Sequence, residues 1–240
     1  MNKSGHIHGS LAYYDAMQAF IPLKSHSERV PGKNFKHLGG KPLYLWIITT
    51  LLMIPEVNGI VIDTDSDDRD LWKLAEHPKI EIKKRSPNLV GDFVSMNEII
   101  LDYLVTASEN DFLMTHATNP FLSKETIVKA IQDYYDQKEK GFDSLFSVSA
   151  IQGRLFNQLA KPINHDPSKL IRTQDLETIF LENSCLYLFD KATFLKNHAR
   201  IGSKPYLLAI PALDAIDIDT KEEWDLAQKI ASGLSAVIPN

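Results

Sequence analysis

The chain has 240 residues, 44% of them hydrophobic, and a formal net charge of −5 at pH 7. This length is enough for one substantial core with a small appended lobe. The acidic balance argues against nucleic-acid binding, which usually requires a basic excess, and no apolar run approaches the roughly 18 residues of a membrane span.

Short β-type runs alternate with helical patterns, which predicts an α/β domain with a mainly parallel sheet and flanking helices. The expected strands are residues 19–23, 58–64, 80–84, 112–115, 144–150, 184–189 and 206–210. The expected helices are residues 42–54, 67–76, 95–108 and 124–139, followed by a last helix that opens at Thr220. Ser95 with Glu98, and Thr220 with Glu223, have the spacing of capping boxes.

The alternation breaks between Ile151 and Glu182, where the chain is polar and irregular. We predict a small inserted lobe or hairpin over residues 151–182, and this lobe is the best candidate for a dimer contact. We interpret residues 1–18 as an N-terminal extension and residues 19–240 as one domain. Because the N-terminal segment has no apolar stretch followed by a cleavage site, we expect a cytoplasmic protein.

The loop after the first expected strand concentrates positive charge. Lys24, Arg29 and Lys33 lie within ten residues, and Ser25 and Ser27 lie among them. A triphosphate needs several cations and exposed backbone N–H groups on one concave surface, which a loop at the carboxyl edge of a sheet can supply. The loop is therefore a candidate phosphate site, although a basic loop of this kind can also be a solvated face.

Two aspartates, Asp217 and Asp219, stand two positions apart just before the last helix. In an extended segment such residues project from one face, about 6.5 Å apart. Their carboxylates can ligate Mg²⁺, which prefers oxygen ligands and also binds phosphates. Alternatively, they only favour the helix N-terminus through its dipole. A rival pair, Asp63 and Asp65, lies at the end of the second expected strand.

Two motifs of the chain are specific: the loop IPLKSHSERVPGKNFKHLGGKPL and the segment AIDIDTKEEWDLA. They resemble the patterns IPARxxSxRxPxKNxxxLxGKPL and SIDIDTExDxxLA, which open and close the acylneuraminate cytidylyltransferases. VIDTDSDD, RSPNLVGD, THATNPFLS and RTQDL resemble four shorter segments of that family, VSTDSxE, RPxxLxxD, LQPTSPLR and RRQDL, in the same order. The resemblance extends from Ala19 to Ala231.

The resemblance implies a nucleotide-diphospho-sugar transferase fold of the Rossmann-like type and a homodimer made partly by the inserted lobe. It also implies Mg²⁺-dependent synthesis of a CMP-sugar from CTP and an acidic keto-sugar, with release of pyrophosphate. The catalytic residues that it implies are Asp217, Asp219, Lys33 and Arg29, of which the two aspartates hold the metal. The nucleotide-binding residues are Lys24, Ser25, Ser27, Arg29, Lys33, Asn34, Arg85 and Ser95. The sugar-binding residues are His116, Thr118, Asn119, Gln174 and Asn183.

Three positions depart from the family pattern. Lys24 replaces an arginine and loses the planar fork that binds phosphate bidentately. His116 replaces a glutamine, and in LENSCLYL, which matches RPNGAIYI, Leu181 stands where arginine is expected. We therefore expect an acidic sugar other than plain N-acetylneuraminate. The ordinary pKa of histidine, about 6.5, would make sugar affinity sensitive to mildly acid pH.

Two other classes stay open. A glycosyltransferase of the DxD type would use Asp63 and Asp65, although the cationic loop argues against it. A non-catalytic nucleotide-binding paralogue would account for the three departures, although the retained Asp217 and Asp219 argue otherwise. The single cysteine, Cys185, lies in an apolar run and is predicted to be buried and inert.

Overall fold

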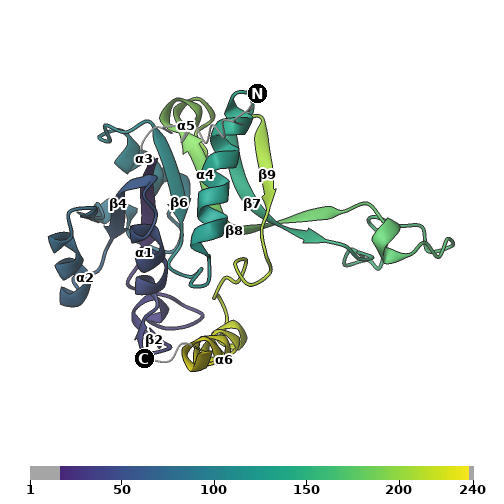
Figure 1. Ribbon diagram of the computed structural model, residues 1–240, viewed down its shortest axis with the longest axis horizontal. Coiled ribbons are helices and arrows are strands. Elements are labelled where there is room, and N and C mark those ends of the chain that lie inside the picture. Colours follow the sequence, from purple (N-terminus) through teal and green to yellow (C-terminus); the bar gives the residue numbers. More distant parts are fainter. Residues whose placement is uncertain (1–16, 238–240) are drawn as a thin grey trace, which may run out of the picture.

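A seven-stranded sheet forms the centre of the protein (Figure 1). The computed structural model describes residues 17–237, with the side chains of residues 17–234. The expected N-terminal extension therefore lies outside the described residues, apart from Met17 and Gln18. The strand order is β5-β4-β1-β6-β8-β7-β9, and within this sheet only β8 runs antiparallel to its neighbours. The predicted α/β architecture with a mainly parallel sheet is confirmed.

The strands of the sheet agree with the predicted ones to within two residues at each end, with one exception. They are β1 (Met17–Leu23), β4 (Val57–Thr64), β5 (Ile80–Lys84), β6 (Asp111–Thr115), β7 (Ser144–Ile151), β8 (Ile179–Asp190) and β9 (Pro205–Ala209). The exception is β8, which begins five residues before the expected Ser184 because its first residues pair with the far end of β7. A short hairpin of β2 (His37–Leu38) and β3 (Lys41–Pro42) was not predicted.

Every predicted helix is present. The α-helices are α1 (Tyr44–Leu52), α2 (Arg69–Lys73), α3 (Met96–Leu104), α4 (Lys124–Lys138), α5 (Lys191–Asn197) and α6 (Lys221–Val237), and the 3-10 turns are η1 (Lys33–Phe35), η2 (Leu74–Glu76), η3 (Pro87–Leu89) and η4 (Thr173–Asp175). Both predicted capping boxes are confirmed, since the backbone N–H groups of Ser95 and Thr220 donate to the carboxylates of Glu98 and Glu223 at 3.1 and 2.7 Å. The short helix α5 was not predicted.

Helices cover both faces of the sheet, and alternate residues of each buried strand face different helices. On one face Ile21 packs in a cluster with residues of α1 and α4, such as Ile47 and Ile131. On the other face Phe20 packs with residues of α3, such as Tyr103, at a ring-centroid distance of 5.2 Å. Within the described part of the chain, no helix combines the length and apolarity needed to cross a membrane.

Residues 152–178 form an arm that projects from the body between β7 and β8 (Figure 1). Polar contacts hold the arm together. The side-chain amide of Gln152 donates to the carbonyls of Thr173 and Leu176, both at 2.8 Å, and that of Asn164 donates to the carbonyl of Gly153 at 2.7 Å. The lobe expected at residues 151–182 falls on this arm and on the strand ends that carry it.

A large bulge interrupts β8 where the arm joins the body. Between the pairs Phe146↔Tyr187 and Val148↔Glu182, β7 advances two residues and β8 advances five. The bulge is stabilised by Ser147, whose hydroxyl donates to the Asn183 side chain at 2.6 Å. Bulges often lie beside functional sites, where they turn a side chain in a new direction.

Ser184 lies in this bulge with a φ of 58°, in the left-handed region that favours glycine. We expect Ser184→Gly to be more stable than Ser184→Ala by about 1 kcal/mol, because both variants lose the hydroxyl but only glycine relieves the backbone. Urea unfolding measures the difference. Ser149, on β7 and outside the left-handed region, is the matched control, and there alanine should be the more stable variant. If the alanine variant were the more stable one at both positions, the backbone of Ser184 would not be strained.

Candidate functional site

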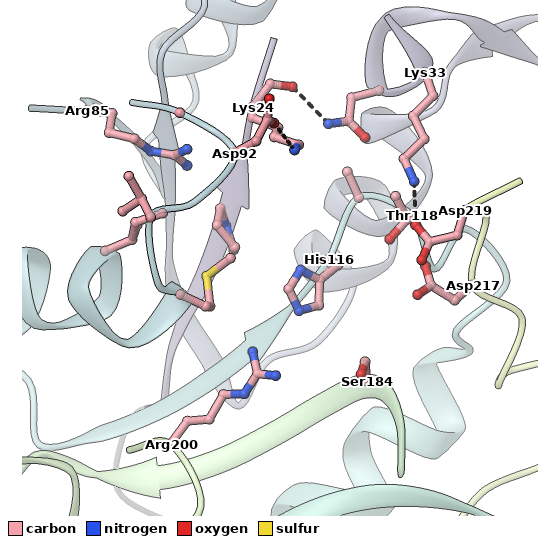
Figure 2. Close-up of a pocket in the computed structure, with 17 residues that line it drawn as sticks. Lys24, Lys33, Arg85, Asp92, His116, Thr118, Ser184, Arg200, Asp217 and Asp219 are labelled. Atoms are coloured by element: carbon pink, nitrogen blue, oxygen red, sulfur yellow. Dashed lines mark hydrogen bonds and ion pairs between the residues drawn. The ribbon is translucent and has the colours of Figure 1, made fainter. Parts of the chain in front are cut away.

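A cavity of about 340 Å³ lies at the carboxyl ends of the parallel strands (Figure 2). Lys24, Arg85 and His116 line it, and they directly follow β1, β5 and β6. Since these strands run parallel, their carboxyl ends meet at one edge of the sheet, where open α/β sheets bind ligands. The full lining is Pro22, Lys24, Lys33, Asn34, Arg85, Gly91, Asp92, Val94, Met96, Ile99, His116, Ala117, Thr118, Ser184, Arg200, Asp217 and Asp219.

The predicted phosphate loop contributes Lys24, Lys33 and Asn34 to this lining. Lys33 is buried at the start of η1, where its ammonium group donates to the carbonyl of Ile218 and pairs with Asp219 at 2.7 Å. The Asn34 amide donates to the carbonyl of Lys24 at 2.9 Å, which ties the two ends of the loop together. The loop is therefore folded back on itself rather than extended into solvent.

Three other predicted residues of this loop do not line the cavity. The backbone N–H of Ser25 donates to Asp65 at 2.6 Å, and Ser27 is buried. Arg29 is well exposed but pairs with the free oxygen of Asp219 at 2.8 Å. Arg29 thus reaches the acidic pair from the solvent side, while Lys33 reaches it from the protein interior.

The predicted acidic pair, Asp217 and Asp219, lies on the wall next to Lys33 (Figure 2). The N–H of Ile218, between them, donates to the Thr118 carbonyl at 2.9 Å and fixes this segment beside β6. Burial raises the pKa of Asp217, and its Oδ1 is a buried oxygen without a hydrogen-bond partner in the described structure. Burial also opposes ionisation of Asp219, but Lys33 and Arg29 outweigh it and hold the pKa of that carboxyl below its usual value.

The rival pair, Asp63 and Asp65, does not line the cavity. Asp63 is fully buried and pairs with the Arg85 guanidinium at 2.5 Å and with Lys83 at 3.3 Å. Arg85, predicted to approach the base, does line the cavity, and its pairing with Asp63 fixes its position. Asp63 therefore positions a cavity residue and is not itself available as a metal ligand.

Only some of the predicted sugar-side residues line the cavity. His116 and Thr118 line the cavity. Asn119 is fully buried, where its amide donates to the Cys185 sulfur at 3.1 Å and to the Ile216 carbonyl at 3.3 Å.

Burial raises the pKa of the Cys185 thiol to about 12, so the predicted buried and inert cysteine is confirmed.

The other predicted residues lie away from the cavity. Gln174 is exposed on the arm, Asn183 holds the β8 bulge, and Ser95 caps α3 beside a smaller, neighbouring hollow. Leu181 is exposed on the arm side of β8 and does not line the cavity either. Its replacement of an arginine therefore gives no argument about the sugar from within a single chain.

The cavity also has lining residues that were not among the predicted site residues. Arg200 comes from the loop after α5, and Ser184 comes from the bulge in β8. Asp92 pairs with Lys24 at 3.0 Å across the mouth of the cavity. Contacts with distant parts of the chain bring Arg200 and Ser184 to the site, whereas Asp92 ends the segment RSPNLVGD that resembles the family pattern RPxxLxxD.

His116 differs electrostatically from expectation. Burial, assisted by the positive charge of Arg200, lowers its pKa to about 3. The expectation that His116 makes sugar affinity sensitive to mildly acid pH is wrong, because the imidazole stays neutral throughout that range. A neutral imidazole can still donate one hydrogen bond and accept another.

No group of three or more His, Cys, Asp or Glu side chains is placed to hold a metal ion within the described residues. A site for Mg²⁺ does not require such a group, because this ion usually keeps several waters and binds one or two carboxylates together with substrate phosphates. Two carboxylates, such as those of Asp217 and Asp219, are therefore enough protein ligands for this ion.

Several known proteins are similar to this chain in sequence. A family model described as cytidylyltransferase matches residues 19–230. The N-acylneuraminate cytidylyltransferase of Oncorhynchus mykiss is 27% identical over 88% of this chain and 49% of its own length, and the chain spans about half the length of the first curated relatives it matches. The CMP-N,N'-diacetyllegionaminic acid synthase of Legionella pneumophila is 29% identical over 88% of this chain and 94% of its own length.

Two solved structures share the fold. The CMP:2-keto-3-deoxy-manno-octonic acid synthetase complexed with CTP has a TM-score of 0.63 and 13% identity, covering 93% of this chain and all of its own. A 4-diphosphocytidyl-2C-methyl-D-erythritol synthase has a TM-score of 0.63 and 14% identity, covering 90% of this chain and 98% of its own. At this identity the likeness concerns the fold alone.

The low pKa of His116 predicts how stability depends on pH. Above about pH 6.5 the imidazole is neutral in both the folded and the unfolded state. As the pH falls from 6.5 toward 3, the unfolded state binds a proton that the folded state does not, so the free energy of unfolding falls by up to about 1.4 kcal/mol per pH unit. His116→Gln removes this contribution. Urea unfolding at pH 7.0, 6.0 and 5.0 should therefore show a shallower pH dependence in the variant, whereas parallel curves would contradict the low pKa.

Proposed function

Because the chain belongs to the cytidylyltransferase family, we propose that it transfers CMP from CTP to an acidic keto-sugar of the sialic acid type and releases pyrophosphate. The observation that carries this proposal is the pairing of Lys33 with Asp219 in one cavity, 186 positions apart in the sequence. This pairing brings the candidate phosphate loop and the candidate metal ligands together. The names of the relatives, which mention an N-acylneuraminate and N,N'-diacetyllegionaminic acid, support an acidic sugar as the acceptor.

In the proposed reaction, the anomeric hydroxyl oxygen of the sugar attacks the α-phosphorus of CTP in line with the leaving group. A new P–O bond forms, the bond from the α-phosphorus to the bridging oxygen breaks, and its electron pair leaves with pyrophosphate, while the hydroxyl proton is released to solvent. Lys33 and Lys24 bind the phosphates, and Arg85 approaches the base. Such a reaction is accelerated mainly by positioning and by neutralisation of charge, which these cations provide.

We propose Asp217 and Asp219 as the residues that would hold Mg²⁺. The free, buried Oδ1 of Asp217 fits a cation, since a carboxylate oxygen in that position otherwise lacks any partner. Asp219 fits if Arg29 leaves it, and the exposed guanidinium of Arg29 is then available for a phosphate oxygen. When bound there, Mg²⁺ would neutralise phosphate charge and stabilise the leaving group.

The two alternatives have less support. A glycosyltransferase of the DxD type would need Asp63 and Asp65 in the cavity, but Asp63 is fully buried against Arg85 and Lys83. A paralogue that only binds nucleotide has no need of Asp217, whose buried, partnerless oxygen destabilises the fold unless a ligand uses it.

Pyrophosphate release tests the proposed function. We expect release with CTP, and not with ATP, GTP or UTP, when N-acetylneuraminate, N,N'-diacetyllegionaminate or 2-keto-3-deoxy-manno-octonate is the acceptor. Asp219→Asn and Asp217→Asn should lower turnover about a hundredfold or more at limiting Mg²⁺, because each removes stabilisation of charge worth several kcal/mol. Glu222→Gln, an exposed carboxylate in the first turn of α6, is the matched control and should behave as wild type. Near-normal turnover in Asp219→Asn would refute the metal assignment.

We also propose that the arm mediates a homodimer. Large apolar side chains are exposed along it, among them Phe156, Leu159, Ile163 and Leu170. Contiguous exposed apolar surface commonly marks an interaction site. A second copy of this chain is the proposed occupant, because the resemblance of the chain to acylneuraminate cytidylyltransferases implies a dimer built partly on this segment.

Sedimentation velocity tests the dimer. We expect the wild type to sediment as a dimer and Leu170→Asp to sediment mainly as a monomer, because a charge buried at an interface is strongly unfavourable. Leu170 is 92% exposed in the isolated chain, so this substitution should leave the melting temperature of the monomer unchanged. Val105→Asp, at the end of α3, is the control for an exposed apolar residue elsewhere. A monomeric wild type at micromolar concentration would rule out the arm as a dimer contact.

A further inference from the structure

Arg200 enters the cavity on a different side from the other cations. In the view of Figure 2, Arg200 and Ser184 lie below His116, whereas Lys24, Lys33 and Arg85 lie above it. The phosphate loop belongs to the upper side. An anion bound by Arg200 would therefore be a different group from the triphosphate.

The charge of Arg200 is less compensated than that of the other cations that line the cavity. Lys24, Lys33 and Arg85 each have a carboxylate oxygen within 3.0 Å. For Arg200, the nearest carboxylate oxygen in the described structure belongs to Glu182, at 3.9 Å. The positive charge of Arg200 acts on the cavity-lining His116, whose pKa it helps to lower.

Arg200 is also held in a fixed position. Its guanidinium lies over the Tyr187 ring, 3.7 Å from the centroid, and donates to the Tyr187 hydroxyl at 2.9 Å. Tyr187 is fully buried, and its hydroxyl donates in turn to Glu182. A guanidinium fixed in this way loses little entropy when it forms two parallel hydrogen bonds with a carboxylate.

The shape of the site places Arg200 between two hollows. A second hollow of about 200 Å³ shares Met96 and Arg200 with the main cavity and is also lined by Ser95, Asn97 and Glu182. In a 2-keto-acid sugar, the carboxylate and the attacking hydroxyl are attached to the same carbon. A carboxylate on Arg200 would keep that carbon in the main cavity, while the rest of the sugar extends toward the polar lining of the second hollow.

We propose that Arg200 binds the carboxylate of the sugar substrate and thereby selects acidic sugars; this inference rests on the proposed function. The guanidinium donates two parallel hydrogen bonds to the carboxylate oxygens, and Tyr187 and Glu182 hold the guanidinium in place. In the family pattern an arginine stands at the position of Leu181. In this chain Arg200, from the loop between α5 and β9, would supply the positive charge instead.

The test compares each sugar with its own methyl ester. Pyrophosphate release is measured with CTP and with N-acetylneuraminate or N,N'-diacetyllegionaminate, each as the free acid and as the methyl ester. We expect wild type to prefer the acid about tenfold or more in kcat/KM, as charge-assisted hydrogen bonds require. Arg200→Gln should reduce this preference to less than threefold, mainly through KM, and Arg200→Lys should give an intermediate value. Arg69→Gln, on the exposed surface of α2, removes the same charge elsewhere and should keep the wild-type preference.

Calorimetry with CTP separates the possible failures. Unchanged CTP affinity in Arg200→Gln, together with loss of the preference for the acid, supports the proposal. An undiminished preference for the acid, or a loss of CTP affinity comparable to the loss of sugar affinity, overturns it. If Arg200→Gln turns over too slowly to measure, the preference of Arg200→Lys decides, and a wild-type value there overturns the proposal. A wild type that releases no pyrophosphate with any acid would instead refute the proposed function itself.

Discussion

The ion pair between Lys33 and Asp219 is the interaction on which the site depends. A buried ammonium group is very costly unless it is paired, and Lys33 has two acceptors, the carboxylate of Asp219 and the carbonyl of Ile218. Both belong to the last segment before α6, whereas Lys33 belongs to the first loop of the domain. The pair therefore closes the chain on itself, and the N–H of Ile218 fixes the same segment to the end of β6. This closure brings the cations of the first loop and the acidic pair before α6 into one cavity, although they belong to separate elements.

Two other cations of the cavity are paired with carboxylates in the same way. Lys24 faces Asp92, Arg85 faces Asp63 and Lys33 faces Asp219, so most of the positive charge that a triphosphate needs is already balanced by carboxylates. These pairs differ in how easily they can exchange. Asp63 is fully buried with Arg85 and can only position it, whereas Lys24 and Asp92 are both partly exposed and can separate at little cost. Binding of a phosphate would therefore rearrange the mouth of the cavity more than its interior.

Local signals in the sequence were sufficient for most of the fold. Apolar runs gave the strands, and the capping boxes at Ser95 and Thr220 marked two helix starts, because capping is a contact between residues three apart. The resemblance to the acylneuraminate cytidylyltransferases agrees with the family match. Arg200, Ser184 and the early start of β8 could not be predicted, since each depends on partners far along the chain. For the same reason Asn119 and Asn183, chosen as sugar ligands, turned out to hydrogen-bond Cys185 and Ser147.

The bulge in β8 also limits how this chain can change in length. Side chains alternate between the faces of a strand, and the three additional residues of β8 reverse that alternation between its two halves. As a result Glu182 lies on the same side of the sheet as Tyr187, within hydrogen-bonding distance of its hydroxyl. A single-residue deletion in the bulge would turn Glu182 to the opposite face, whereas a deletion of two residues would preserve its side. Among descendants of this sequence, the bulge should therefore gain or lose residues in pairs, while the arm beyond it is free to vary by any number.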